Sequence, residues 1–305
     1  MQIIFLGTAG SIPTPKRSLP AVLIKRRDEQ IMFDAGEGVQ KQMIIAKTGF
    51  NKKMKVFITH MHGDHVLGLP GLLQTMTLLE RQKPLEIYGP SGITQFLEDL
   101  RKTVQFALTY LVEIREIENP GIVCSEQEYF VRAIRSDHSI PGLVYALIEK
   151  PRPGRFYPKK AKALGVPEGI LWSKLQKGQK ITLPDRQTVK PEEVMGPLRR
   201  GRKIVYTGDT RPFTKLTELA SNADLLIHDA TLGDDMKSRA EEDGHSTPGQ
   251  AAKIAKKAKV KQLVLTHISA RYEDTTSLLN QAKKTFKNTV IAEDFMKLEI
   301  PLLDE

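Results

Sequence analysis

The stretch Thr59–Leu69, THMHGDHVLGL, places three histidines and an aspartate within six positions. The chain has only 7 histidines among its 305 residues, so this is a marked concentration. The stretch follows an apolar run, KVFI, that is typical of a buried β-strand. A single histidine at a strand end could simply cap backbone groups. Three of them in the pattern His-x-His-x-Asp-His instead indicate a metal site.

The pattern suggests how two ions could be held. Side chains alternate along an extended segment, so His60 and His62 point the same way and can reach one ion. Asp64 and His65 lie where the chain turns into the next predicted helix, and they can reach a second ion nearby. Nitrogen-rich ligands with a few carboxylates favour zinc or, less selectively, another first-row divalent metal.

Three further apolar runs end near a histidine or an aspartate. These residues are His138 after EYFVRAIRSD, Asp209 after KIVYTG and His267 after LVLT. Loops at strand ends converge on one cleft, so we expect the three residues to join the His60 cluster. Two ions about 3.5–4 Å apart need a bridging ligand, and an aspartate is the usual one. Asp209 is the candidate for the bridge.

Composition indicates a globular protein with a substantial core. The chain is 40% hydrophobic and 27% charged. We expect no membrane span, because no run of about 18 or more apolar residues occurs. The N-terminal MQIIFLGTAG has the pattern of a first strand and not of a signal peptide. With a single cysteine, Cys124, no internal disulfide can form, and we expect a cytoplasmic location.

Apolar periodicity predicts two α/β halves. Strands are expected at residues 2–7, 21–26, 30–36, 55–60, 85–89, 128–136, 143–150, 202–208, 224–230, 262–267 and 289–294. Helices are expected at 39–47, 69–82, 91–105, 214–222, 247–259 and 277–286, with Ser91 as a candidate N-cap. Two halves of similar rhythm favour an α/β sandwich, in which two mixed sheets pack face to face with helices outside.

The segment between the halves differs in composition. The net charge of the chain is +10. From Lys150 to Lys203 there are fifteen Lys or Arg against four Asp or Glu, so the rest of the chain has a net charge of −1. Within one domain spanning 1–305, we therefore predict an inserted, flexible basic arm at 151–195. Such a focused charge favours a polyanionic partner, although an ordinary solvated surface is the alternative.

The combination of HMHGDH, His138, Asp209 and His267 resembles the metallo-β-lactamase superfamily. Within it, the chain resembles the ribonuclease Z family of tRNA 3′-processing endonucleases nearly from end to end. The His-x-His-x-Asp-His motif alone identifies only the superfamily. The branch is identified by GHSTPGQAA, LTHISARY and the basic RPGRFYPKKAKALGVPEG.

The resemblance implies a site with two zinc ions. One ion would be held by His60, His62 and His138, and the other by Asp64, His65 and His267, with Asp209 between them. It also implies the catalytic residues Asp64, His245 and Asp229. Asp64 would take the proton of a metal-activated water, and His245 in GHST would protonate the leaving 3′ oxygen. Asp229 stands in HDAT, where the family has Glu, and would orient His245.

Several basic residues are candidates for binding the phosphates of an RNA substrate. They are Arg271, Lys16 and Arg17 outside the arm, and Arg155, Lys159, Lys160 and Lys162 within it. Each could equally be an ordinary surface base. Trp172 could stack on a base or anchor the arm to itself. His228 lies inside an apolar run, which favours a structural role.

Three classes of function remain open. The first is removal of the 3′ trailer from precursor tRNA, and the second is hydrolysis of a small molecule, including a cyclic phosphodiester, on the same fold. The third is RNA binding without catalysis. The basic arm argues against the second, and the complete set of ligands argues against the third. Members of the resembled family are usually homodimers, so we expect a homodimer.

Overall fold

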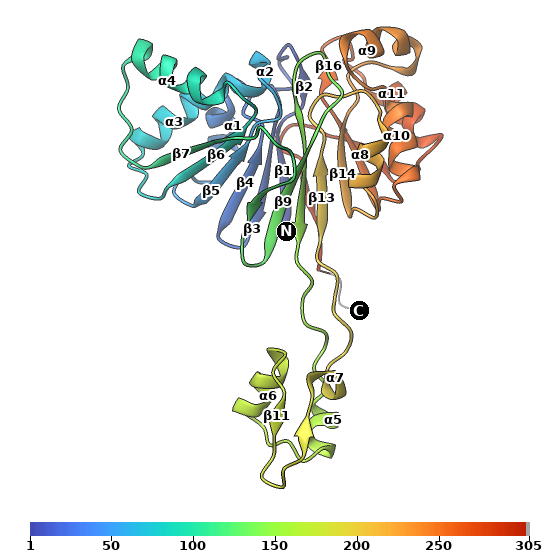
Figure 1. Cartoon of the computed structure of the whole chain (residues 1–305). Coiled ribbons are helices and arrows are strands. Elements are labelled where there is room, and N and C mark those ends of the chain that lie inside the picture. Colours follow the sequence, from blue (N-terminus) through green and yellow to red (C-terminus); the bar gives the residue numbers. More distant parts are fainter. Residues whose placement is uncertain (303–305) are drawn as a thin grey trace. The chain divides into compact units, whose positions relative to one another are not determined.

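The computed structural model describes residues 1–302. These residues form two compact units (Figure 1). One unit combines Met1–Ile148 with Lys203–Pro301, and the other contains Glu149–Arg202. Among the described residues, no helix is both long enough and apolar enough to span a bilayer.

The larger unit contains two seven-stranded sheets. The first consists, in spatial order, of β18 (Lys297–Glu299), β1 (Gln2–Gly7), β3 (Ala21–Arg26), β4 (Glu29–Phe33), β5 (Lys53–Phe57), β6 (Leu85–Gly89) and β7 (Val112–Glu116). The second consists of β17 (Thr289–Ile291), β15 (Gln262–Thr266), β14 (Leu225–Asp229), β13 (Lys203–Tyr206), β10 (Leu143–Glu149), β9 (Tyr129–Arg135) and β8 (Ile122–Ser125). Both sheets mix parallel and antiparallel pairs, as predicted.

Helices cover the outer face of each sheet (Figure 1). The first sheet carries α1 (Val39–Ile45), α2 (Gly63–Val66), α3 (Gly68–Leu78) and α4 (Ile93–Val104). The second carries α8 (Thr214–Leu219), α9 (Lys237–Asp243), α10 (Pro248–Lys257) and α11 (Thr276–Lys283). The predicted α/β sandwich is therefore confirmed.

The alternation of side chains along each strand explains this layering. In β1, Ile3 and Phe5 belong to the core between the two sheets. Ile4 and Leu6 face the other way and belong to the core beneath the helices of the first sheet. Successive residues of β1 thus fill different cores, and both faces of this strand are buried.

Some local predictions were wrong. Ser91 does not cap α4, because the residue before the helix is Gly92, with a φ of 98° and no side-chain cap. The strand predicted at 55–60 ends at Phe57, so His60 lies in the loop beyond it. The apolar pattern also did not predict β7, β8 and β18. Of these, β18 is three residues long and is paired antiparallel to β1 at the far end of the chain.

The smaller unit has a core of its own. It contains α5 (Pro158–Ala163), α6 (Ile170–Gln176), β11 (Ile181–Thr182), β12 (Thr188–Val189) and α7 (Pro191–Val194). These elements bury a cluster that includes Leu175 and Val189. Trp172 packs against Phe156, with ring centroids 5.1 Å apart, and its indole nitrogen donates to the Val166 carbonyl. Trp172 thus anchors the unit internally.

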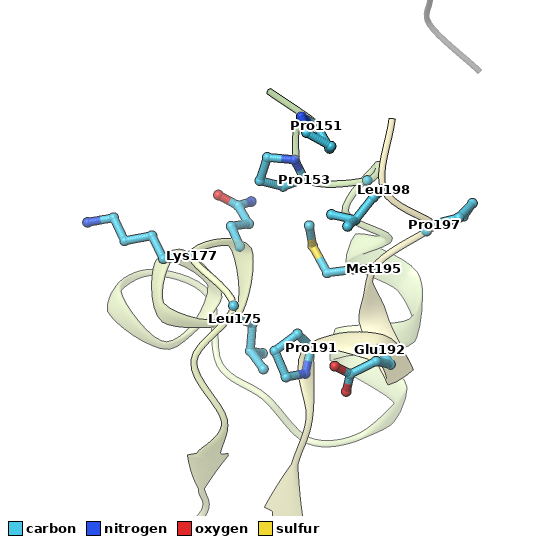
Figure 2. A pocket seen from close by; sticks show the side chains of 13 residues that line it. Pro151, Pro153, Leu175, Lys177, Pro191, Glu192, Met195, Pro197 and Leu198 are labelled. Atoms are coloured by element: carbon cyan, nitrogen blue, oxygen red, sulfur yellow. The ribbon is translucent and has the colours of Figure 1, made fainter. Parts of the chain in front are cut away.

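This unit also contains an apolar pocket of about 690 Å³ (Figure 2). Its wall includes Pro151, Pro153, Leu175, Met195, Pro197 and Leu198. Lys177 and Glu192 are the charged residues in its lining.

Candidate metal centre

The first group of candidate ligands gathers three imidazoles. Nδ1 of His62 lies 3.0 Å from Nε2 of His60 and 3.2 Å from Nε2 of His138. Oδ2 of Asp209 lies 3.7 Å from Nε2 of His60. These residues come from loops after β5, β9 and β13, which are far apart in the sequence. All four donor atoms lie within 4.8 Å of one another, so a single ion can contact them.

The second group is formed by Asp64, His65 and His267, together with Asp209. Nε2 of His267 lies 3.3 Å from Oδ2 of Asp64, from Nε2 of His65 and from Oδ2 of Asp209. Nε2 of His65 lies 3.5 Å from Oδ2 of Asp64 and 3.3 Å from Oδ2 of Asp209. Ligand atoms about 2.0–2.2 Å from a tetrahedral zinc ion are separated by roughly 3.3–3.6 Å, so the spacing of Asp64, His65 and His267 fits one ion.

Asp209 connects the two groups through one oxygen. Its Oδ2 contributes to both sets of distances. Its Oδ1 is buried, and no hydrogen-bond partner for it exists in the described part of the chain. A buried carboxylate oxygen without a partner is costly unless it contacts a cation. The orphaned oxygen therefore supports a fit between these residues and two ions.

The protonation of the histidines supports the same conclusion. Burial, with the charge of His65, lowers the pKa of His60 to about 2. Burial also lowers the pKa of His62 and His138, so all three imidazoles stay neutral, as metal ligation requires. Burial alone would lower the pKa of His65, but the nearby carboxylates, first that of Asp209, hold it well above its usual value. Positive charge is therefore favoured at His65, and a cation at Nε2 can supply it.

A buried carboxylate orients the His65 ring by contacting Nδ1, the nitrogen that does not face the candidate metal site. Asp34 is fully buried, and its Oδ2 lies 2.8 Å from Nδ1 of His65. The same carboxylate accepts the Tyr206 hydroxyl at 2.8 Å and the Thr59 backbone N–H at 2.7 Å. With Nδ1 donating to Asp34, Nε2 of His65 faces the site with a free lone pair. Asp34 was not among the predicted site residues, and the local signal that marks it is its position directly after β4.

Two other candidate ligands, His60 and His138, are also held at their second ring nitrogen. Nδ1 of His60 contacts the Thr59 hydroxyl at 3.0 Å, and Nδ1 of His138 lies 2.8 Å from the Gly244 carbonyl oxygen. Gly244 has a φ of 86°, and a Cβ atom there would lie 2.6 Å from Nδ1 of His138. Only glycine therefore allows this close approach. Such outer contacts fix the tautomer and the orientation of each ring.

His245 lies beside the centre and pairs with Asp229. Its Nδ1 is 3.0 Å from Oδ2 of Asp229, so the shorter aspartate still makes the contact. Burial alone would lower the pKa of His245, but the charge and hydrogen bond of Asp229 raise it to about 9. Asp209, His245 and His267 also lie close enough to share an ion. The engagement of Nδ1 with Asp229 favours a proton donor over a ligand at His245.

The candidate phosphate-binding residues divide into two kinds. Arg17 points inward, where its Nη1 donates to the Thr8 hydroxyl at 2.7 Å and to the Ala292 carbonyl at 2.5 Å. The others are exposed: Lys16, Arg271, Arg155, Lys159, Lys160 and Lys162. Among them, Lys162 pairs with Glu168 at 2.6 Å. The Arg17 guanidinium thus makes hydrogen bonds within the protein, whereas the exposed side chains are accessible to a polyanion.

His228 is buried, and its Nδ1 lies 2.8 Å from the Asp229 carbonyl oxygen. Burial lowers its pKa, so the ring is neutral. The ring contacts the backbone of β14, the strand that carries Asp229, and this contact agrees with the predicted structural role.

Two models of protein families match this chain, each over a different part of the sequence. A model described as β-lactamase superfamily domain matches residues 175–268, and one described as anti-Pycsar protein Apyc1 matches residues 1–147. Ribonuclease Z of Methanosarcina acetivorans is 51% identical over 100% of both chains. Ribonuclease Z of Archaeoglobus fulgidus is 46% identical, and the match covers 98% of this chain and 97% of that one.

Solved structures agree with these relatives. The short form of human tRNase Z matches with a TM-score of 0.74 and 30% identity, covering 99% of this chain and 100% of that one. YhfI from Bacillus subtilis, a metallo-β-lactamase fold protein, matches with a TM-score of 0.69 at 17% identity, covering 97% and 98%, and supports the fold alone. The chain has the metallo-β-lactamase fold and belongs to the ribonuclease Z family.

Proposed function

We propose that this chain is a metal-dependent endoribonuclease that removes the 3′ trailer of tRNA precursors and leaves a 3′-OH on the tRNA. The observation that carries the proposal is a cluster of seven His and Asp side chains with the spacing of two metal sites. It occurs in a chain whose full-length relatives are named ribonuclease Z.

We further propose two zinc ions per chain. His60, His62 and His138 would hold one, Asp64, His65 and His267 the other, and Asp209 would contact both. When bound, two such ions lower the pKa of an attacking water and neutralise charge on the phosphate. The ligand distances and the orphaned oxygen of Asp209 support this arrangement.

Two side chains would move the protons. Asp64 is partly exposed at the mouth of the centre, and its Oδ2 accepts the Ser11 backbone N–H at 2.9 Å. It would accept the proton of the attacking water. His245 would donate a proton to the leaving 3′ oxygen, while Asp229 holds it in place. No 2′-hydroxyl takes part, because the nucleophile is water.

The arm would bind the RNA. Its basic excess and its exposed Arg155, Lys159 and Lys160 suit the phosphates of a nucleic acid. All seven proposed ligands lie outside Glu149–Arg202, so the arm would contribute affinity and not chemistry.

We also propose a homodimer in the cytoplasm. Large apolar side chains are exposed on the helix pair α1 and α3 and at its ends, namely Ile44, Ile45, Leu67, Leu78 and Leu79. Leu78 is 82% exposed. Exposed apolar surface is a property of protein interfaces, so these side chains support the proposal. A cytoplasmic location fits a chain whose single cysteine, Cys124, is buried and free.

Hydrolysis of a small phosphodiester is the second candidate, because the proposed ligand set is complete without the arm. The two candidates are separated by comparing precursor tRNA with small cyclic phosphodiesters as competing substrates. Preferential release of the 3′ trailer supports the proposal, and preferential hydrolysis of the small ester overturns it.

A further inference from the structure

The hydroxyl of Thr231 lies between the candidate metal site and the candidate proton donor. Its Oγ1 is 2.7 Å from Nδ1 of His267, 2.6 Å from Oδ1 of Asp229 and 3.2 Å from Nδ1 of His245. Thr231 is only 7% exposed, so water does not compete strongly for these contacts. One side chain thus touches a candidate ligand and both members of the acid pair.

The hydrogens at this point can be assigned from chemistry. Nε2 of His267 faces Asp64 and Asp209, and it can bind a cation only as a free lone pair. The ring proton is then on Nδ1 and is donated to Oγ1 of Thr231. A hydroxyl has a single hydrogen, and the ionised carboxylate of Asp229 is its acceptor. The hydroxyl therefore has to receive from His267 and donate to Asp229 at the same time.

The second oxygen of Asp229 completes the arrangement. Oδ2 accepts from Nδ1 of His245 at 3.0 Å and from the Ser246 backbone N–H at 3.1 Å. Oδ1 accepts the Thr231 backbone N–H at 2.9 Å besides the hydroxyl. This backbone bond joins residues two apart, which is the geometry of an aspartate turn. The short side chain of aspartate closes this turn, and Oδ1 is thereby fixed towards Thr231.

We propose that Thr231 is a positioning residue that couples the two halves of the centre. Its hydroxyl holds His267 in the tautomer that binds metal, and it holds Asp229 in the rotamer that orients His245. Threonine suits this role because its branched Cβ restricts rotation of the hydroxyl. The inference rests on the proposed function for the role of His245, but the contact with His267 can be tested without RNA.

The test compares Thr231→Val, which keeps the shape but loses the hydroxyl, with Thr231→Ser, which keeps the hydroxyl. Thr48→Val is the matched control, since Thr48 is buried and, within residues 1–302, its hydroxyl bonds only to the Met43 carbonyl. Three quantities are measured for each folded variant: zinc affinity by chelator competition, the tautomer of His267 by nitrogen NMR, and hydrolysis of two aryl phosphodiesters at saturating zinc. Their leaving groups are nitrophenol, which needs little protonation, and phenol, which needs more.

Thr231→Val should lower zinc affinity by about 10–100-fold, as loss of an outer-shell partner typically does. It should disturb the His267 tautomer and slow the phenyl ester more than the nitrophenyl ester. Thr231→Ser should restore all three quantities to within a few-fold, and Thr48→Val should change none. The proposal is overturned if the valine variant changes only zinc affinity and the His267 tautomer, or only the hydrolysis of the two esters. It is also overturned if the serine variant is as impaired as the valine variant. Failure of the unaltered protein to cleave precursor tRNA would count against the proposed function but would leave these readouts intact.

Discussion

The carboxylate of Asp34 lies 2.8 Å from Nδ1 of His65, on the side of the ring that faces away from the candidate metal ions. Asp34 is fully buried, and it also receives hydrogen bonds from Tyr206 and Thr59. Thr59, which follows β5 of the first sheet, and Tyr206, in β13 of the second sheet, therefore both contact the Asp34 side chain. The orientation of His65, in α2, depends in this way on the hydroxyl of Tyr206 in β13 of the second sheet.

Replacing Asp34 by Asn should weaken metal binding. The amide keeps the size of the side chain but loses the charge that favours a cation at His65. We expect zinc affinity to fall by about 10–100-fold, as for other outer-shell partners. Tyr206→Phe removes one hydrogen bond to Asp34 but keeps its charge, so it is the milder control. Equal zinc affinity in the Asn variant and the unaltered protein, measured by chelator competition, would refute the role of Asp34.

Replacing His245 by Ala should slow the reaction by about 10²–10⁴-fold without loss of zinc, because a general acid contributes that much. A nitrophenyl phosphodiester needs little protonation of its leaving group, so its hydrolysis should suffer much less than cleavage of precursor tRNA. Zinc content and both rates are measured on the same preparation. Equal losses on the two substrates would exclude a proton donor at this position.

The pH profile should respond to Asp229. A donor must carry its proton, so His245 acts below its own pKa, which burial lowers but Asp229 raises to about 9. Asp229→Asn removes the charge that raises this pKa. The alkaline fall in the rate should therefore begin at a lower pH in the variant, and the acidic side of the profile should change less. An alkaline limb that stays in place would show that His245 is not the titrating donor.

Replacing Pro151–Met195 by a short Gly/Ser linker should separate affinity from chemistry. The segment forms its own small core and contains none of the proposed ligands, so zinc content and hydrolysis of a small phosphodiester should persist. Binding of precursor tRNA should fall sharply. The logarithm of affinity should also depend less steeply on the logarithm of salt, because each lost phosphate contact removes a slope of about 0.7–0.9.

A charge variant within the arm gives a finer version of the same experiment. Lys159→Gln combined with Lys160→Gln removes two exposed charges from the arm, whereas Lys256→Gln combined with Lys257→Gln removes two exposed charges from α10. Only the first pair should reduce the salt slope. Equal effects of the two pairs would mean that the net charge of the chain, and not the arm, sets the affinity for RNA.

The layers of the fold and the cluster of candidate ligands were accessible to sequence reasoning because both are local patterns. His60, His62, Asp64 and His65 lie within six positions of the chain, and the apolar run of β1 is visible in QIIFLG. A strand that ends near His or Asp is likewise recognisable without knowledge of its neighbours.

Asp34 and Thr231 were not accessible in this way. Asp34 meets Tyr206 across 172 positions, and Thr231 meets His267 across 36, so neither contact leaves a pattern in its own segment. The short β18 is a strand only because β1 provides its hydrogen-bond partners. The inward orientation of Arg17 likewise depends on the distant Ala292 carbonyl, 275 positions away. Roles that arise from long-range pairing required the folded structure.

The central claim is most directly tested by mapping the ends produced from a tRNA precursor that carries a 3′ trailer. With divalent metal, we expect a tRNA that ends in a 3′-OH and a trailer that begins with a 5′-phosphate. Chelation should abolish this cleavage, added zinc should restore it, and His267→Ala should lack it while still binding the RNA. Cleavage that survives chelation, or a tRNA product ending in a 2′,3′-cyclic phosphate, would contradict the account.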